Sequence, residues 1–117
     1  VQYSLLYPDR ADGVDAPLAF DQPFSLDFRP PDLDKFRCLR LAMESLRGGE
    51  SAPCVFNAAN ELAVAAFLDG RIRFPQIAEV IDKVLQKISI RRLSSLDTVL
   101  DVDAEARRAA ATEIEKR

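Results

Sequence analysis

The segment from Val55 to Leu68 constrains the fold of this chain more than any other. Eleven of its 14 residues are apolar, and they cover nearly every face of the helix that it would form. Ser51 can cap such a helix, Pro53 suits its first turn, and Gly70 follows its last apolar residue. A helix that is hydrophobic all round has to be surrounded by other protein. We therefore predict a central helix, whose many alanines let its neighbours approach closely.

Two amphipathic helices are predicted on either side of it. After Asp32, apolar residues recur at spacings of three and four, and Gly48-Gly49 can end the helix in a left-handed conformation: Phe36, Leu39, Met43 and Leu46. Residues 75–88 carry a cleaner stripe, with charged residues on the opposite face: Ile77, Val80, Ile81, Val84, Leu85 and Ile88. The pattern is typical of a helical bundle.

The C-terminal part has a weaker pattern. Residues 95–100 indicate a short turn of helix, and Asp103 is expected to cap a last helix that runs from Ala104 to about Lys116. The apolar stripe of this last helix is thin, and we expect the helix to be partly exposed and frayed: Ala106, Ala109 or Ala110, and Ile114.

Residues 1–35 differ in character from the rest. They hold five of the seven prolines, and residues 1–7 read like the tail of a helix that ends at Pro8. Residues 24–29 alternate strictly between apolar and polar, which predicts a half-buried strand. A lone strand needs a partner, so its sheet is expected to lie mostly outside this chain. The predicted fold is mainly α: a C-terminal helical bundle over residues 36–117, preceded by a linker over residues 1–35 with one detached β-strand.

The composition of the chain excludes several classes of function. The net charge is −3 and the predicted pI is about 5.0, which argues against nucleic acid as a partner. No apolar run is long enough to cross a membrane. Cys38 and Cys54 are expected to be reduced thiols in the cytoplasm. The chain has no histidine and opens on Val1 without an initiating methionine, so we expect a piece of a longer chain without a catalytic site of its own.

Asn57, Asn60 and Glu61 form the most conspicuous polar cluster. Two amides and a carboxylate in the first turns of a mostly buried helix are costly unless they are hydrogen-bonded. They either tie down the helix start and the incoming loop, or contact a ligand or metal near the helix N-terminus. The acidic residues near the C-terminus lack the glycine of a calcium loop, and capping and solvent exposure explain them: Asp97, Asp101, Asp103 and Glu105.

Several motifs together resemble a known family. The chain holds a Leu-x-Phe strand pattern, a Pro-Asp pair, a helix that begins Phe-Arg-Cys-Leu, and a helix with the run Asn-Ala-Ala-Asn-Glu: residues 26–28, 31–32, 36–39 and 57–61. Residues 72–74 and 102–104 also match, as do residues 1–3 and 7–10. The chain resembles the C-terminal portion of 1-deoxy-D-xylulose-5-phosphate reductoisomerase over essentially its whole length.

The resemblance implies a function for a parent enzyme. That family rearranges 1-deoxy-D-xylulose 5-phosphate and reduces the product with NADPH, using a divalent metal (Mg or Mn), to 2-C-methyl-D-erythritol 4-phosphate, an isoprenoid precursor. Its members are homodimers with a nucleotide-binding domain, a catalytic domain and a C-terminal helical domain. The resemblance implies that residues 1–35 end the catalytic domain and link it to the helical domain, and that the cofactor, metal and catalytic residues precede this chain. Asn57, Asn60 and Glu61 could then support the active site from behind.

Two other readings remain open. A stand-alone helical module could present a groove to a partner helix, and the apolar side of residues 24–28 favours it. A complete small metalloenzyme would need ligands that the sequence does not supply.

Overall fold

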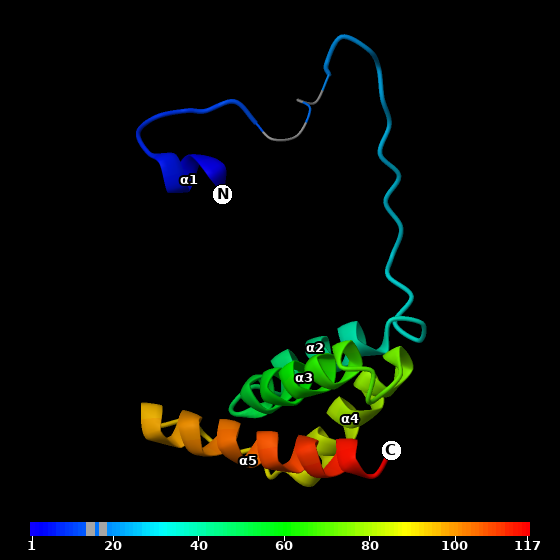
Figure 1. The fold of residues 1–117 in the computed structure, drawn as a ribbon, viewed down its shortest axis with the longest axis vertical. Coiled ribbons are helices and arrows are strands. Elements are labelled where there is room, and N and C mark those ends of the chain that lie inside the picture. The colour runs from blue at the N-terminus through cyan, green and yellow to red at the C-terminus, as the bar shows by residue number, and fades with distance from the viewer. Residues whose placement is uncertain (14–15, 17–18) are drawn as a thin grey trace. The chain divides into compact units, whose positions relative to one another are not determined.

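The computed structural model describes residues 1–13, 16 and 19–117, and it divides the chain into two compact units, Val1–Pro30 and Pro31–Arg117. Figure 1 traces the chain from the N-terminus in blue to the C-terminus in red. Each unit is described by itself.

The described residues of the first unit form one short helix, α1 (Gln2–Leu6), in the place where the sequence predicts the tail of a helix. The side-chain amide of Gln2 donates to the backbone oxygen of Asp12 over 2.9 Å, and Arg10 lies 4.3 Å from the centre of the Tyr3 ring. These contacts fold residues 1–12 back on themselves.

Residues 24–29 do not form the predicted strand within the described part of the chain. Phe24, Leu26 and Phe28 are all exposed, Phe28 to 88%. A strand is held by hydrogen bonds to a neighbouring strand, and the described residues offer none. The alternating pattern is therefore present without the sheet that it would need.

The second unit is a bundle of four helices: α2 (Arg37–Gly48), α3 (Ala52–Leu68), α4 (Phe74–Lys87) and α5 (Leu96–Glu115). Helix α3 packs against the other three helices, and α4 packs against both α2 and α5. The side chains of Val55, Ala58, Ala59, Ala63 and Ala66 on α3 are fully buried. Helix α3 is therefore central to the bundle, as predicted (Figure 1), but it is not surrounded on every side, because Asn57, Glu61 and Ala65 are exposed. None of the described helices is long and apolar enough to cross a membrane.

Helix α2 ends where the sequence predicts, but it buries an unexpected face. Gly49 follows it with φ +65°, and its N–H donates to the backbone oxygen of Ser45 over 3.0 Å. Leu41 and Ser45 are the buried residues of this helix. The apolar residues at spacings of three and four are all exposed to more than a third: Phe36 to 53%, Leu39 to 42%, Met43 to 37% and Leu46 to 74%.

Helix α4 confirms its predicted stripe. Ile77, Val80, Ile81 and Val84 are buried along it, and Ile88 is buried just after its end. Helix α4 therefore joins α3 in forming the core of the bundle.

The C-terminal prediction is wrong in two respects. Helix α5 is one continuous helix, capped by Ser95, whose hydroxyl accepts from the N–H of Thr98 over 3.2 Å. Asp103 lies inside this helix and does not cap it, because no glycine or proline interrupts the chain there. The helix is partly exposed, as the sequence predicts, since Arg108, Thr112 and Glu115 are exposed. Its predicted apolar stripe is buried together with Val102, and the small side chains let α5 lie close to α3 and α4: Ala106, Ala109, Ala110 and Ile114.

Candidate functional site

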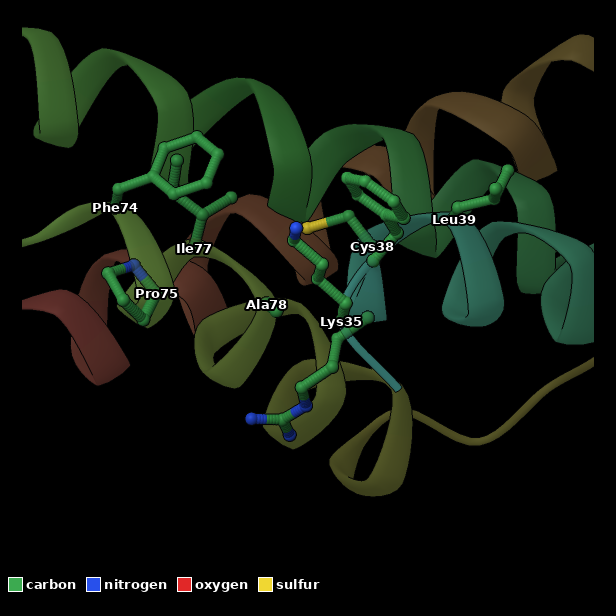
Figure 2. Close-up of a pocket in the computed structure, with 9 residues that line it drawn as sticks. Lys35, Cys38, Leu39, Phe74, Pro75, Ile77 and Ala78 are labelled. Atoms are coloured by element: carbon green, nitrogen blue, oxygen red, sulfur yellow. The ribbon is translucent and has the colours of Figure 1, made fainter. Parts of the chain in front are cut away.

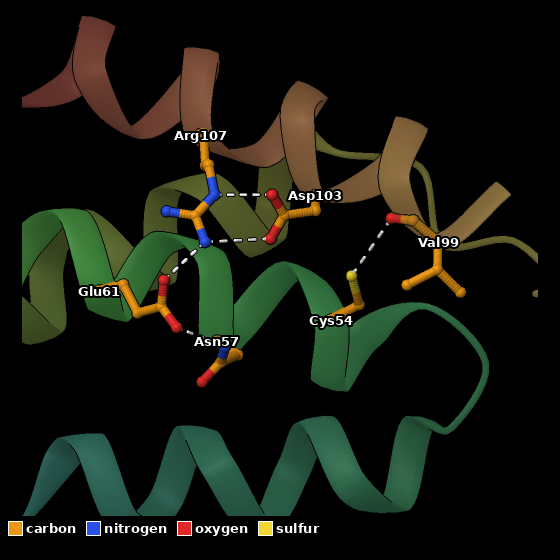
Figure 3. A network of polar contacts seen from close by, with 6 residues as sticks. All are labelled: Cys54, Asn57, Glu61, Val99, Asp103 and Arg107. Atoms are coloured by element: carbon orange, nitrogen blue, oxygen red, sulfur yellow. Dashed lines mark hydrogen bonds and ion pairs between the residues drawn. The ribbon is translucent and has the colours of Figure 1, made fainter. Parts of the chain in front are cut away.

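The predicted polar cluster on α3 is built on one exposed side of that helix. Asn57 and Glu61 are one helical turn apart, and the side-chain amide of Asn57 donates to Glu61 Oε1 over 3.0 Å. Both residues are exposed, so the expectation of a buried cluster is wrong for them. Asn60 is half-buried and takes no part in this hydrogen bond. Figure 3 shows the pair on α3.

Arg107 of α5 connects this pair to the neighbouring helix. Its Nη2 donates to Glu61 Oε2 over 2.6 Å, and its Nε and Nη2 donate to the two oxygens of Asp103 over 2.6 and 3.2 Å. Asp103 and Arg107 are themselves one turn apart on α5. The guanidinium group thus lies between two carboxylates from different helices (Figure 3), and it links α3 to α5. We call Asn57, Glu61, Asp103 and Arg107 the interhelical network.

The electrostatics of the network follow from these contacts. The hydrogen bond from Arg107, and then that from Asn57, lower the pKa of the Glu61 carboxyl. The carboxylates of Asp103 and Glu61 raise the pKa of the Arg107 guanidinium. Both groups are therefore charged at neutral pH, and Glu61 is unsuited to act as a general acid there. The network can hold two helices together, and its charges are already paired.

Cys54 lies beside the network on α3. Its thiol contacts the backbone oxygen of Val99, with the sulfur 3.7 Å from that oxygen (Figure 3). Partial burial, followed by the nearby Asp103 carboxylate, raises the pKa of the Cys54 thiol. A raised thiol pKa disfavours the reactive thiolate.

The hydrogen bonds of Asn57 and Glu61 in the described part of the chain go to each other and to Arg107. The loop before α3 is held instead by Ser51, whose buried hydroxyl accepts from the backbone N–H of Arg91 over 2.9 Å. Sequence reasoning identified Ser51 as a cap, and it missed this link to a residue 40 positions away. The four-residue spacing of Asp103 and Arg107 could have predicted their ion pair. The sequence held no comparable signal for the ion pair between Arg107 and Glu61.

A second feature is a groove between the starts of α2 and α4, with a volume of about 360 Å³. Figure 2 shows the side chains that line it from both helices. Its lining is mostly apolar, with two basic residues: Lys35, Phe36, Arg37, Cys38, Leu39, Phe74, Pro75, Ile77 and Ala78. Phe74 is 71% exposed, and its ring packs edge-on against that of Phe67, with the ring centres 5.6 Å apart.

The described residues do not form a cluster of metal ligands. No three of their cysteine and carboxylate side chains gather as metal ligands would. Two of the acidic residues near the C-terminus are engaged in ion pairs, Asp103 with Arg107 and Glu105 with Arg91 at 2.9 Å. The fold and these features define a helical-bundle domain with an ion-paired contact between α3 and α5 and an open apolar groove.

The comparisons with known proteins define the family. Residues 1–109 match the family model of the DXP reductoisomerase C-terminal domain. The chain belongs to this family.

Its relatives are longer proteins. It is 48% identical over 107 residues to the 1-deoxy-D-xylulose 5-phosphate reductoisomerase of Pseudomonas fluorescens strain Pf0-1, covering 92% of this chain and 27% of that protein. It is 46% identical over 110 residues to the enzyme of the same name from Cupriavidus pinatubonensis, covering 94% of this chain and 28% of that one. The chain thus spans little more than a quarter of the length of these relatives.

Two solved structures have the same fold. The enzyme from Zymomonas mobilis in complex with NADPH matches with a TM-score of 0.81 and 41% identity, over 99% of this chain and 31% of that one. A DOX-P reductoisomerase in complex with magnesium matches with a TM-score of 0.77 and 35% identity, over 98% of this chain and 31% of that one.

Proposed function

We propose that this chain is the C-terminal portion of an NADPH-dependent 1-deoxy-D-xylulose 5-phosphate reductoisomerase. The observation that carries the proposal is the match of residues 1–109 to the family of this domain, together with relatives that are enzymes of that name. The parent enzyme would rearrange 1-deoxy-D-xylulose 5-phosphate and reduce the product to 2-C-methyl-D-erythritol 4-phosphate. It would do so in the cytoplasm, as a homodimer.

NADPH and the divalent metal would be held by the part of the parent enzyme that precedes this chain. The solved relatives whose descriptions name NADPH and magnesium are about three times as long as their match to this chain. No group of three metal-ligating side chains gathers among the described residues of this chain. When bound in the parent enzyme, NADPH would supply the hydride and the metal would polarise the substrate oxygens.

Residues 1–35 would form the end of the catalytic domain and the linker, and residues 36–117 the helical domain. Residues 24–29 would then become a strand by adding to a sheet of the catalytic domain, which would cover Phe24, Leu26 and Phe28. The exposure of these three side chains in the present chain supports this assignment.

The role of the helical domain would be structural support. The helical domain would hold the catalytic domain in place by burying apolar surface between them, and each Å² buried stabilises the contact by about 25 cal/mol. Asn57, Asn60 and Glu61 would support the active site from behind, without contact to the substrate. The link from Glu61 to Arg107 and Asp103 supports this role, because it fixes α3 on α5.

The test is an assay of substrate-dependent NADPH oxidation by the full-length protein. We expect activity in the full-length protein and none in residues 1–117 alone. A full-length protein that binds neither substrate nor NADPH would refute the proposal. The supporting role is tested separately by Asn60→Ala in the active enzyme, and unchanged turnover together with an unchanged melting temperature would refute it.

A stand-alone interaction module is the second candidate. The open groove between α2 and α4 favours it. Such a module would be monodisperse and stable by itself, whereas a separated part of an enzyme would self-associate through residues 24–29. Sedimentation of the isolated chain distinguishes the two.

A further inference from the structure

The groove between α2 and α4 continues onto an exposed apolar face of α2. Phe36 and Leu39 belong both to the groove lining and to this face, which Met43 and Leu46 extend along the helix. Contiguous apolar surface of this kind is uncommon on proteins that act alone, and it marks a contact with another protein surface. We call the groove and this face together the α2 docking surface.

The charge of the groove indicates the chemistry of its partner. Lys35 and Arg37 line it, and its described lining contains no carboxylate. Arg37 is 3.6 Å from Asp82, outside the groove lining, while Lys35 forms no ion pair within the described part of the chain. An occupant that brings a carboxylate to Lys35 together with an apolar side chain would satisfy both features of the groove.

The chain itself indicates where such an occupant would come from. The proposed function places residues 24–29 in a sheet of the catalytic domain, and Lys35 of the groove follows Arg29 by only six residues, which span at most roughly 22 Å. A domain connected in this way is present at the groove at an effective concentration in the millimolar range. It would therefore outcompete dilute partners for the docking surface.

We propose that the α2 docking surface holds a segment of the catalytic part of the same parent enzyme. That segment inserts an apolar side chain between Leu39 and Phe74 and places a carboxylate beside Lys35. This inference rests on the function proposed above, and it names the surface through which the helical domain supports the catalytic domain.

Cys38 provides a reporter, because it lines the groove (Figure 2). The experiment compares its rate of alkylation by iodoacetamide in the full-length enzyme and in isolated residues 1–117, with modification followed by peptide mass spectrometry. Cys54 is the internal control, since it lies on α3 outside the groove. We expect Cys38 to react at least about tenfold more slowly in the full-length enzyme, which corresponds to a docked population above about 90%, and Cys54 to react at similar rates in both.

Two variants of the full-length enzyme test the identity of the surface. Leu39→Glu places a charge in the groove and should restore rapid alkylation of Cys38. Leu96→Glu is the matched control, because Leu96 is 71% exposed at the start of α5 and lies outside the groove, so it should leave Cys38 protected. The charge reversal Lys35→Glu should release Cys38 as well.

Three results would overturn the inference. Equal rates of Cys38 alkylation in the full-length enzyme and the isolated chain would mean that nothing in the parent covers the groove. Protection in the isolated chain that rises with concentration would mean that a second copy covers it. Protection that survives Leu39→Glu would place the cover elsewhere. NADPH oxidation is measured on the same samples, so an active enzyme with an open groove refutes this inference alone, whereas an inactive full-length protein refutes the proposed function.

Discussion

Replacing Ala106 by leucine tests whether α5 lies flush against the bundle. The side chain of Ala106 is fully buried, in the thin apolar stripe that the sequence indicates for this helix. If there were room at this position, burying three additional carbons would stabilise the fold by about 2.4 kcal/mol, at about 0.8 kcal/mol per carbon. If α5 is as close to its neighbours as the structure shows, the added carbons overpack the interface and cost about 1–3 kcal/mol. The two situations therefore differ in the sign of the effect.

The assay is urea unfolding of the 117-residue chain followed by helical circular dichroism, with thermal unfolding in parallel. For a unit of this size, a loss of about 1–3 kcal/mol lowers the melting temperature by roughly 4–24 °C. Ala65→Leu is the matched control, because Ala65 lies on the exposed side of α3 and the same substitution there should change stability by less than about 0.5 kcal/mol. An Ala106→Leu variant that is as stable as the parent chain, or more stable, would refute the close packing of α5.

Further predictions concern single residues. The pKa of Glu61 is lowered in the folded chain, so its ionised carboxylate stabilises the fold at neutral pH, and that contribution is lost as the pH falls through the folded pKa. The melting temperature of Glu61→Gln should therefore fall less steeply on acidification than that of the parent chain. An identical pH profile for the two proteins would contradict the interhelical network. The Ser45 hydroxyl is buried without a hydrogen-bond partner among the described residues, so urea unfolding should show Ser45→Ala to be as stable as the parent chain or more stable by about 1 kcal/mol, and a clear loss would reveal a missing partner. Gly49→Ala should lower stability by about 1 kcal/mol because Gly49 has φ +65°. Gly48→Ala, whose new methyl would meet the Ala52 side chain at an ordinary 3.8 Å, should raise it by about 0.5–1 kcal/mol, and equal effects at the two glycines would contradict the helix end described here.

The helices could be predicted from the sequence because their signals are local. The apolar composition of Val55–Leu68 predicts a central helix, and the spacing of apolar residues from Ile77 to Ile88 predicts a helix with one apolar face. The burial of α2 could not be predicted in the same way. It carries apolar residues on more than one face, and only the position of its neighbours decides that Leu41 is buried while Leu46 is exposed.

Two other features were hard to predict from the sequence: packing through alanine side chains, and contacts between residues far apart in the chain. An alanine stripe gives a weak hydrophobic signal, although it permits the closest packing, so the sequence identified Ala106 and Ala110 as part of the stripe without indicating how completely they are buried. The partner of Glu61 lies 46 residues away on another helix, and no local pattern connects them. The strand at residues 24–29 illustrates the opposite case, in which a clear local pattern lacks the neighbours that would realise it.

The measurement that tests the central claim most directly is the intact mass of the protein that carries this sequence in its own cells. The chain has a mass of 13.0 kDa, and it matches about 28% of the length of its relatives. A parent reductoisomerase of that proportion has a mass of roughly 46 kDa, obtained by dividing the first figure by the second. A mass near this value is the expected result. A protein of 13.0 kDa would contradict the account, and the stand-alone interaction module would then explain the open groove better.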